Sequence, residues 1–340
     1  MVEVGKFTLE SLTTGMYSDP RIVYREYIQN SVDSIENAVA EGLMSNEDAY
    51  IKVFIDAENG CISIIDNGKG ISVARATNVL LSIGKSTKRQ DANRGFRGIG
   101  RLGGLSYCER LSFTTSVQGE DVATRIIFDC KLLKSLLSPD HEEELDLQSV
   151  IERITEVEEI DADKDDHFFR VDMDEVDSSS ELLDLDEIKQ YLSEVAPVPY
   201  DERHFVVAPE IKRFLNEHDY TLTEFKIFIG YDEDHLKQVH KPNRYRFRSD
   251  RNQRTEDVIT EVVTFSIDLD STSSLLGWYG RCNWNGTLSD NGLLGMRMRL
   301  GNILIGDRRT MDVMFKEPRF NGWVQGEIFV NTTGPVSYTH

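Results

Sequence analysis

Three polar side chains near the start of the chain have types and a spacing that suit chemistry. Glu26, Asn30 and Asp33 follow one another at intervals of four and three residues, which places all three on one face of an α-helix. Carboxylates exchange protons with water, and carboxylate and amide oxygens bind hard cations. A solvated helix face is the alternative interpretation, and this segment alone does not decide between the two.

The helix that would carry these side chains is expected to begin with Asp19 as the N-cap and Pro20 in the first turn. Aspartate caps helix N-termini, and proline is tolerated there because its missing N–H would have no partner inside the helix. Apolar side chains should supply the buried stripe: Ile22, Val23, Ile28 and Val32.

A β-hairpin is expected next, because two strand-like segments, residues 50–57 and 61–65, are separated by a short turn. The second strand ends at Asp66, and Gly68 and Gly70 follow it. Glycine lets the backbone come close to a ligand while the carboxylate accepts hydrogen bonds from it. Such turns also occur without a ligand, so this motif is weak by itself.

A glycine-rich segment at residues 95–100 forms the third element, and a basic, hydroxyl-rich segment at residues 84–89 precedes it. Glycine-rich backbone leading into a helix N-terminus makes an anion cradle, because free N–H groups and the helix dipole point at the ligand. The basic segment suits a flap over a polyphosphate. The residues concerned are Lys85, Lys88, Gly95, Gly98 and Gly100.

In this order and spacing, the three elements resemble the Bergerat-fold (GHKL) ATPases. That superfamily includes the ATPase subunit of DNA gyrase, the ninety-kilodalton heat-shock chaperones, MutL and MORC proteins and sensor histidine kinases. The resemblance covers residues 8–175 and implies an α+β chain with a Bergerat-fold α/β sandwich ATPase domain at residues 1–198. Its ligands would be ATP and Mg²⁺. The sequence contains no GxxxxGK pattern followed by Ser or Thr, so a P-loop enzyme is excluded.

The resemblance also implies roles for individual residues. Glu26 matches the catalytic carboxylate that orients and deprotonates the attacking water, a contribution of about a hundred- to ten-thousand-fold. Asn30 matches the metal ligand, which binds Mg²⁺ together with phosphates and waters, and Asp33 matches a residue that helps to orient the pocket. Asp66 matches the acceptor for the adenine amino group. The remaining residues would contact the base or the phosphates: Gly68, Gly70, Lys85, Lys88, Gly95, Gly98 and Gly100.

One strand departs from the family pattern. These ATPases close the pocket with a strand carrying a glycine–threonine pair, whose hydroxyl bonds the adenine-binding aspartate and a water. The best candidate here, residues 167–173, has Phe168 and Phe169 at those positions. Either another strand closes the pocket, or the water network beside the adenine is built differently.

Composition limits the class of function. The net charge of −21 argues against non-specific nucleic-acid binding as the main activity, because phosphate contacts dominate such binding. No apolar run reaches the length that spans a bilayer, and no phosphoacceptor helix precedes Glu26, so a membrane sensor kinase is not expected. The four cysteines show neither CxxC pairing nor zinc spacing. Reduced thiols in a cytoplasmic protein are the simplest account.

A second domain is expected at residues 199–340. A helix at residues 178–194 should end before a Pro-Val-Pro sequence. This part resembles, more faintly, the transducer (middle) domain of chaperone-like ATPases, which has a ribosomal-protein-S-five-like βαβ fold. In the family that domain extends a lysine or arginine to the γ-phosphate. No match for this cation is evident before His340, so the chain is expected to be the N-terminal part of a longer protein. Strands are expected at residues 225–230, 258–269, 295–305 and 326–331.

Two further segments compete for a functional role. Within the basic segment 237–254, Arg244, Arg246 and Arg248 alternate and would share one face of a strand. Arginine with interleaved aromatic residues can grip single-stranded nucleic acid, but a solvated strand face is favoured. Trp278 and Trp284 could form a binding surface, and packing between two sheets explains them equally well.

The resemblance implies an ATP-driven conformational machine of the chaperone-like kind. ATP would close a lid at residues 84–104 and bring two copies together as a homodimer, and hydrolysis would reopen them. The further partner would be an unidentified protein client or C-terminal effector. Two alternatives stay open: a nucleic-acid-remodelling ATPase resembling MutL or MORC, and a switch that binds ATP without hydrolysing it.

Overall fold

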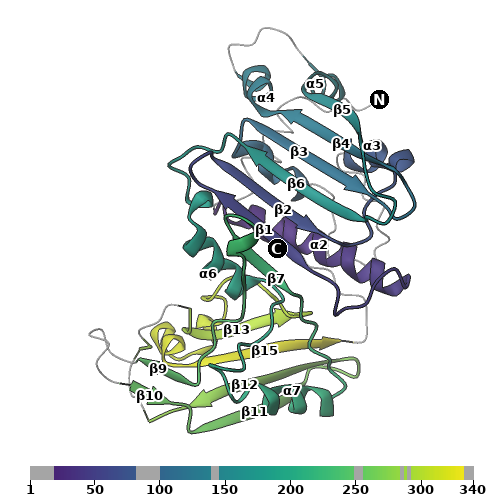
Figure 1. Cartoon of the computed structure of the whole chain (residues 1–340). Coiled ribbons are helices and arrows are strands. Elements are labelled where there is room, and N and C mark those ends of the chain that lie inside the picture. The colour runs from purple at the N-terminus through teal and green to yellow at the C-terminus, as the bar shows by residue number, and fades with distance from the viewer. Residues whose placement is uncertain are drawn as a thin grey trace. The chain divides into compact units, whose positions relative to one another are not determined.

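The computed structural model describes residues 19–81, 100–138, 145–248, 256–283, 287–288 and 292–332. The chain forms two compact units (Figure 1). The first comprises the chain up to Lys189 together with Lys226–Gln238, and the second comprises Gln190–Phe225 together with the chain from Val239 onward. The boundary expected after residue 198 stays a prediction. Among the described residues, no helix is both long enough and apolar enough to cross a membrane.

The first unit is built on a mixed sheet, in which eight described strands lie in the order β5-β4-β3-β6-β2-β1-β7-β8. β1 and β7 run parallel, and the other neighbouring pairs run antiparallel. This arrangement confirms the predicted α+β class. The strands are β1 Ile51–Asp56, β2 Cys61–Asp66, β3 Arg110–Ser116, β4 Val122–Asp129, β5 Thr155–Asp161, β6 Phe168–Asp174, β7 Ile227–Gly230 and β8 Lys237–Gln238.

The predicted hairpin is β1 and β2, joined by a turn at residues 57–60. In both strands buried and partly exposed residues alternate, as expected when one face of a strand packs on a core. The alternation puts Asp66 on the buried face, in line with Ile62 and Ile64. A carboxylate at the end of a buried row is the first structural sign of a site.

Helices complete the first unit, and the longest described one, α2 Ile22–Ala40, contacts β2. The predicted start at Asp19 was wrong. The N-cap position belongs to Arg21, and Asp19 instead accepts the Arg21 backbone N–H at Oδ1, 2.9 Å away, in the turn before the helix. The other helical elements are α3 Val73–Leu81, η1 Gly100–Ser106, α4 Cys130–Leu137, α5 Leu147–Ile154, η2 Glu181–Leu183, η3 Glu233–His235 and the start of α6 Leu185–Val195.

The strand expected at residues 225–230 forms, but the expectation that it belongs to the second domain was wrong. β7 joins the first sheet, where Ile51 pairs with Ile227 and Val53 with Ile229. β7 covers the edge of β1 by backbone pairing, and its side chains Ile227 and Ile229 are buried. Local sequence shows that a segment is a strand, but not which distant strand it will pair with.

The second unit contains a five-stranded sheet of described strands in the order β11-β12-β15-β13-β14. β13 and β15 run parallel, and the other pairs run antiparallel. The strands expected at residues 258–269, 295–305 and 326–331 are confirmed. The elements are α7 Ala208–Glu217, β9 Arg246–Arg248, β10 Glu256–Val258, β11 Glu261–Asp268, β12 Ser273–Arg281, β13 Gly295–Leu300, β14 Ile303–Leu304, η4 Asp312–Met314, η5 Pro318–Trp323 and β15 Gln325–Thr332.

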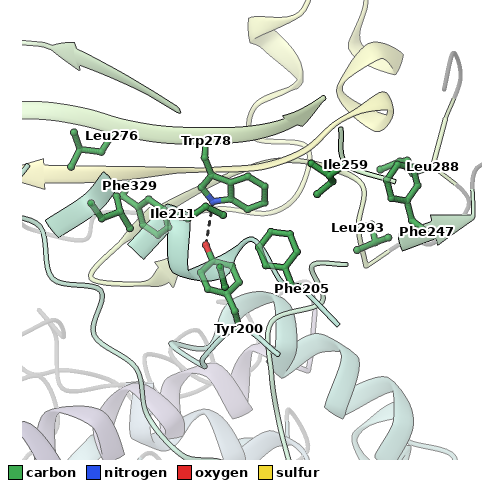
Figure 2. Close-up of a cluster of buried hydrophobic side chains, with 12 residues drawn as sticks. Tyr200, Phe205, Ile211, Phe247, Ile259, Leu276, Trp278, Leu288, Leu293 and Phe329 are labelled. Atoms are coloured by element: carbon green, nitrogen blue, oxygen red, sulfur yellow. Dashed lines mark hydrogen bonds between the residues drawn. The ribbon is translucent and has the colours of Figure 1, made fainter. Parts of the chain in front are cut away.

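An aromatic cluster forms the core of the second unit (Figure 2). Trp278 is fully buried, and its ring lies against those of Tyr200 and Phe205, with centroids 6.4 and 5.3 Å away. The Trp278 indole N–H donates to the Tyr200 hydroxyl at 3.2 Å. Core packing therefore accounts for Trp278, as one of the two expectations had it. Trp284 lies outside the described residues.

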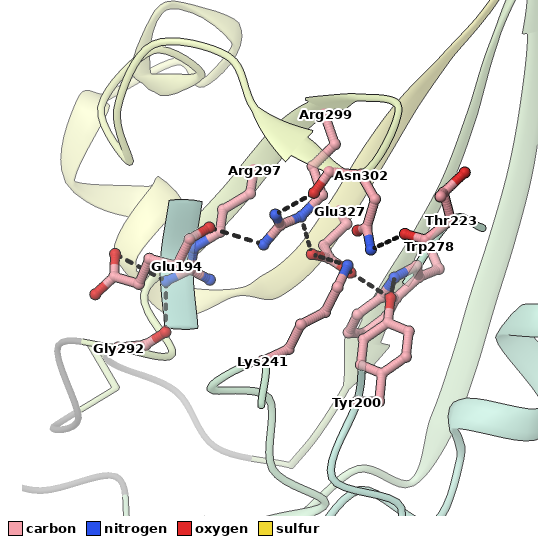
Figure 3. A network of polar contacts seen from close by, with 10 residues as sticks. All are labelled: Glu194, Tyr200, Thr223, Lys241, Trp278, Gly292, Arg297, Arg299, Asn302 and Glu327. Atoms are coloured by element: carbon pink, nitrogen blue, oxygen red, sulfur yellow. Dashed lines mark hydrogen bonds and ion pairs between the residues drawn. The ribbon is translucent and has the colours of Figure 1, made fainter. Parts of the chain in front are cut away.

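A buried charge cluster lies beside this core (Figure 3). Glu327 on β15 is fully buried and contacts Arg299 on β13, Lys241 and the Tyr200 hydroxyl. Lys241 Nζ lies 2.9 Å from Glu327 Oε1. Burial alone would raise the pKa of Glu327, but Arg299 and Lys241 lower it to about 2. The charge cluster thus joins β13, β15 and the segment that carries Lys241 through one ionised carboxylate.

The basic segment was only partly predicted. Arg246 and Arg248 are exposed on β9, on either side of buried Phe247. Arg244 lies before the strand, where its guanidinium donates to the Asn243 carbonyl at 3.0 Å. The expected three-arginine face is therefore reduced to two residues.

Candidate functional site

The polar face of α2 is where the predicted elements meet. Glu26, Asn30 and Asp33 all lie on this helix, Asp33 buried and the other two partly exposed. The turn after β2 reaches the helix at Ser34, whose carbonyl accepts the Lys69 N–H at 3.2 Å. The element η1 also contacts α2. One helix therefore brings together residues that are up to 77 positions apart in the sequence.

Asp66 is a buried carboxylate of the site with a raised pKa. Its side chain is 1% exposed, and Oδ1 accepts the Gly68 N–H at 2.9 Å. Burial raises the pKa of Asp66 to about 7, although Ser31, the Gly68 N–H and Ser34 each act to lower it. Its other oxygen, Oδ2, is buried without a hydrogen-bond partner among the residues that the structure describes.

A buried acceptor without a partner costs about 1–3 kcal/mol. It persists in a folded protein when function requires it, for example when a ligand supplies the missing donor. A ligand N–H group directed at Asp66 Oδ2 would satisfy it. The end of β2 is therefore a candidate site for a group that donates a hydrogen bond.

The turn that follows Asp66 is shaped by its glycines. A β-carbon at Gly68 would lie 2.3 Å from Ser34 Oγ, so only glycine allows this approach to α2. Gly70 has φ +68°, and a β-carbon there would lie 1.9 Å from the Ser116 carbonyl oxygen. Both predicted glycines are thus required by close packing, and Gly70 also by its left-handed backbone.

Two residues that the sequence analysis did not single out hold this turn in place. Thr115 on β3 accepts the Ile71 N–H at 2.8 Å and donates to the Phe168 carbonyl at 3.0 Å. His167 Nδ1 lies 2.7 Å from the Gly68 carbonyl oxygen. His167 could have been noticed at the start of the predicted strand 167–173, whereas Thr115 is too far from its partners in sequence to give any local signal.

The strand expected to close the adenine pocket, residues 167–173, is β6, a direct neighbour of β2. Phe169 is paired with Asp66 across the two strands. The buried hydroxyl of Thr115 lies on β3, the other neighbour of β6. Both expectations for this strand, another strand that closes the pocket or a different water network, stay predictions.

Glu26 and Gly100 lie in close contact. A β-carbon at Gly100 would come within 2.0 Å of Glu26 Oε2. The backbone at the start of η1 is thereby placed against the carboxylate that the sequence analysis selected as the base. The other members of the glycine-rich and basic segments, Lys85, Lys88, Gly95 and Gly98, lie outside the described residues.

Comparison with known proteins agrees with this geometry. Residues 17–163 match the family model described as "Histidine kinase-, DNA gyrase B-, and HSP90-like ATPase".

Among similar curated proteins are three described as "Chaperone protein HtpG". That of Acinetobacter baylyi is 36% identical over 84 residues, 23% of this chain and 13% of that protein. That of Nitrosomonas europaea is 30% identical over 129 residues, 33% and 20% respectively. That of Rickettsia rickettsii is 28% identical over 137 residues, 35% and 22% respectively. The chain thus covers less than a quarter of the length of these relatives.

Proposed function

Because residues 17–163 match the family model of GHKL-type ATPases, we propose that this chain binds ATP with Mg²⁺ and hydrolyses it. The observation that carries the proposal is the buried Asp66 carboxylate, whose Oδ2 has no partner among the described residues. It stands at the end of β2, beside the helix that carries Glu26 and Asn30. A carboxylate that lacks a donor suits the amino group of adenine.

In this proposal Asp66 selects the base. The ionised carboxylate accepts a hydrogen bond from the adenine amino group, and the closely packed Gly68 and Gly70 let the backbone approach the ring. Guanine has an acceptor oxygen at the same place, so the ionised Asp66 would repel it. Ser31 and Ser34 on α2, which act on the pKa of Asp66, help to keep the carboxylate in its charged form.

Glu26 is the proposed general base. It orients a water molecule for attack on the γ-phosphate and accepts its proton, a contribution of about a hundred- to ten-thousand-fold. Asn30, one helical turn later, would bind Mg²⁺ through its amide oxygen, and Asp33 would help to orient the pocket. A single protein ligand is sufficient, since Mg²⁺ usually keeps waters and binds substrate phosphates. The metal would neutralise charge on the phosphates.

The lid, the dimer and the protein client belong to the same proposal. Lys85, Lys88, Gly95, Gly98 and Gly100 would contact the phosphates from a closing lid. The likeness to HtpG chaperones supports a chaperone-like machine that dimerises with ATP and acts on a protein client. The second unit would be its transducer domain. A cytoplasmic location would suit the four free cysteines.

The test is Mg²⁺-dependent ATP hydrolysis by the wild type and by Glu26→Ala, over a range of protein concentrations. Glu36→Ala removes a carboxylate from the same helix and serves as the control. We expect Glu26→Ala to bind ATP with unchanged affinity in calorimetry but to lose turnover. Turnover that rises more steeply than protein concentration would support dimerisation.

Two results would change the proposal. Equal turnover in wild type and Glu26→Ala would remove Glu26 as the base. ATP binding without turnover in any variant would favour the switch that binds ATP without hydrolysing it. Nucleic-acid-stimulated turnover that is lost when Arg246 and Arg248 become glutamate would favour the nucleic-acid-remodelling alternative, which the two exposed arginines of β9 keep open.

A further inference from the structure

Tyr27, the residue after Glu26 on α2, makes two hydrogen bonds that tie this helix to η1. Its hydroxyl donates to the Arg101 carbonyl at 3.0 Å and accepts the Gly104 N–H at 3.1 Å. The side chain is 2% exposed. One hydroxyl therefore holds two backbone groups of η1 to the helix that carries the proposed base.

The contact is specific to these residue types. A tyrosine hydroxyl can donate and accept at once, and burial raises the pKa of Tyr27 well above its ordinary value, so the proton that it donates stays in place. Gly104 is equally constrained, because a β-carbon there would lie 2.4 Å from the Tyr27 hydroxyl. A larger residue at position 104 would push the hydroxyl away.

The hydrogen bond to Arg101 fixes the residue next to Gly100. Gly100 is the point where η1 meets Glu26, since a β-carbon there would lie 2.0 Å from Glu26 Oε2. Neighbouring residues of α2 thus make neighbouring contacts on η1: Glu26 at Gly100 and Tyr27 at Arg101. Movement of η1 away from α2 would break both contacts together.

We propose that Tyr27 is a positioning residue, which holds the backbone of Gly100 against the Glu26 carboxylate and so sets the geometry of the water-activating site. This inference rests on the proposed ATPase function. It goes beyond that function by assigning a role to a residue that would touch neither ATP nor water. Misplacement of a reacting group by about 1 Å can cost roughly a hundredfold in rate, so the loss of this hydroxyl should act mainly on turnover.

Tyr24 provides a matched control on the same helix. It is fully buried, and its hydroxyl donates to the Leu182 carbonyl at 2.7 Å, away from η1. Tyr24→Phe and Tyr27→Phe each remove one hydrogen-bonded hydroxyl from a buried ring. Any general effect of that loss on the stability of the fold should therefore appear in both variants.

The experiment compares wild type, Tyr24→Phe and Tyr27→Phe by kcat, by Kd for ATP and by hydrogen exchange of peptides that cover residues 100–106. We expect Tyr27→Phe to lower kcat about tenfold or more, to change Kd less than about twofold, and to accelerate exchange in these peptides. Tyr24→Phe should leave all three near wild type. Gly104→Ala, which displaces the hydroxyl without removing it, should reproduce the loss of kcat.

Equal kcat losses in the two phenylalanine variants, or wild-type exchange at residues 100–106 in Tyr27→Phe, would overturn the positioning role. A wild type that binds ATP without turnover would instead defeat the proposed hydrolysis. The exchange measurement would then still decide whether Tyr27 holds η1, because it needs no catalysis.

Discussion

The backbone of Gly100 passes so close to Glu26 that a β-carbon would stand 2.0 Å from Oε2. The atom it would strike is the end of a flexible side chain, so Gly100→Ala should fold but force the carboxylate aside. We expect turnover to fall at least tenfold, and by a larger factor than ATP affinity, since the base would leave its place. Calorimetry and steady-state hydrolysis measure the two quantities. Wild-type turnover would show that the position of Glu26 does not limit the reaction.

Gly70→Ala should be costly for a different reason, because its β-carbon would meet backbone, 1.9 Å from the Ser116 carbonyl oxygen. Gly42 is the control, since it shares a positive φ of +74° but has open space around it. Urea unfolding should show a loss of about 1 kcal/mol for Gly42→Ala, from backbone strain alone. For Gly70→Ala we expect about 3 kcal/mol or more. Equal losses would mean that the turn after β2 shifts freely.

Asp66 should release a proton when ATP binds near neutral pH. Its pKa of about 7 reflects burial, and a hydrogen bond from the adenine amino group would stabilise the charged form and lower that pKa. Affinity should therefore fall as pH drops below 7, by up to about tenfold per unit. Calorimetry at pH 7 in two buffers of different ionisation heat measures the released proton, and at pH 9 the release should vanish. Identical heats in both buffers at pH 7 would contradict the adenine role.

Asp66 also determines how the stability of the nucleotide-free protein depends on pH. Because the pKa of Asp66 in the folded state lies above its ordinary value of 3.8, its contribution to stability is complete below that value. It is lost as pH rises through about 7. Asp66→Asn should remove this dependence and abolish ATP binding, because the amide can present a donor to the adenine amino group. Retained micromolar binding by the variant would refute the assignment.

Glu327→Gln should destabilise the second unit strongly. It leaves Arg299 and Lys241 buried without their counter-charge, and breaking a buried ion pair costs about 3–5 kcal/mol. The control is Glu261→Gln, since Glu261 pairs with Arg281 at 2.8 Å with both side chains more than half exposed. Such pairs contribute about 0–1 kcal/mol. Denaturant unfolding compares the two variants, and similar losses would show that the charge cluster is not needed for stability.

The sequence predicted those parts of the site that depend on local pattern. Glu26, Asn30 and Asp33 could be placed on one helix face by their spacing, and the hairpin that ends at Asp66 by its alternating apolar residues. Tertiary contacts could not be predicted from such patterns, because they join residues far apart in the sequence. The hydrogen bonds of Thr115 cross 44 and 53 residues, and those of Tyr27 cross 74 and 77. The start of α2 was misplaced by local chemistry, because Asp19 serves the Arg21 N–H in a turn rather than at the helix terminus.

In the second unit, too, local patterns predicted strands but not the contacts between distant residues. Alternating residues predicted β13 and β14, yet no local pattern marked Glu327 as the partner of Lys241, 86 residues away. The prediction that three arginines share one strand face was wrong, because β9 is only three residues long. Arg244 therefore falls outside the alternation that would align it with Arg246 and Arg248.

The place of β7 in the sheet bears on how the chain is made. The first sheet receives its last two strands from Ile227–Gly230 and Lys237–Gln238, long after the rest of that sheet has left the ribosome. Until then β1 is an edge whose unpaired N–H and C=O groups can pair with strands of other nascent chains. A fragment that ends at residue 198 would keep this edge permanently and should aggregate. The late strands thus couple the solubility of the ATPase domain during synthesis to translation beyond residue 238.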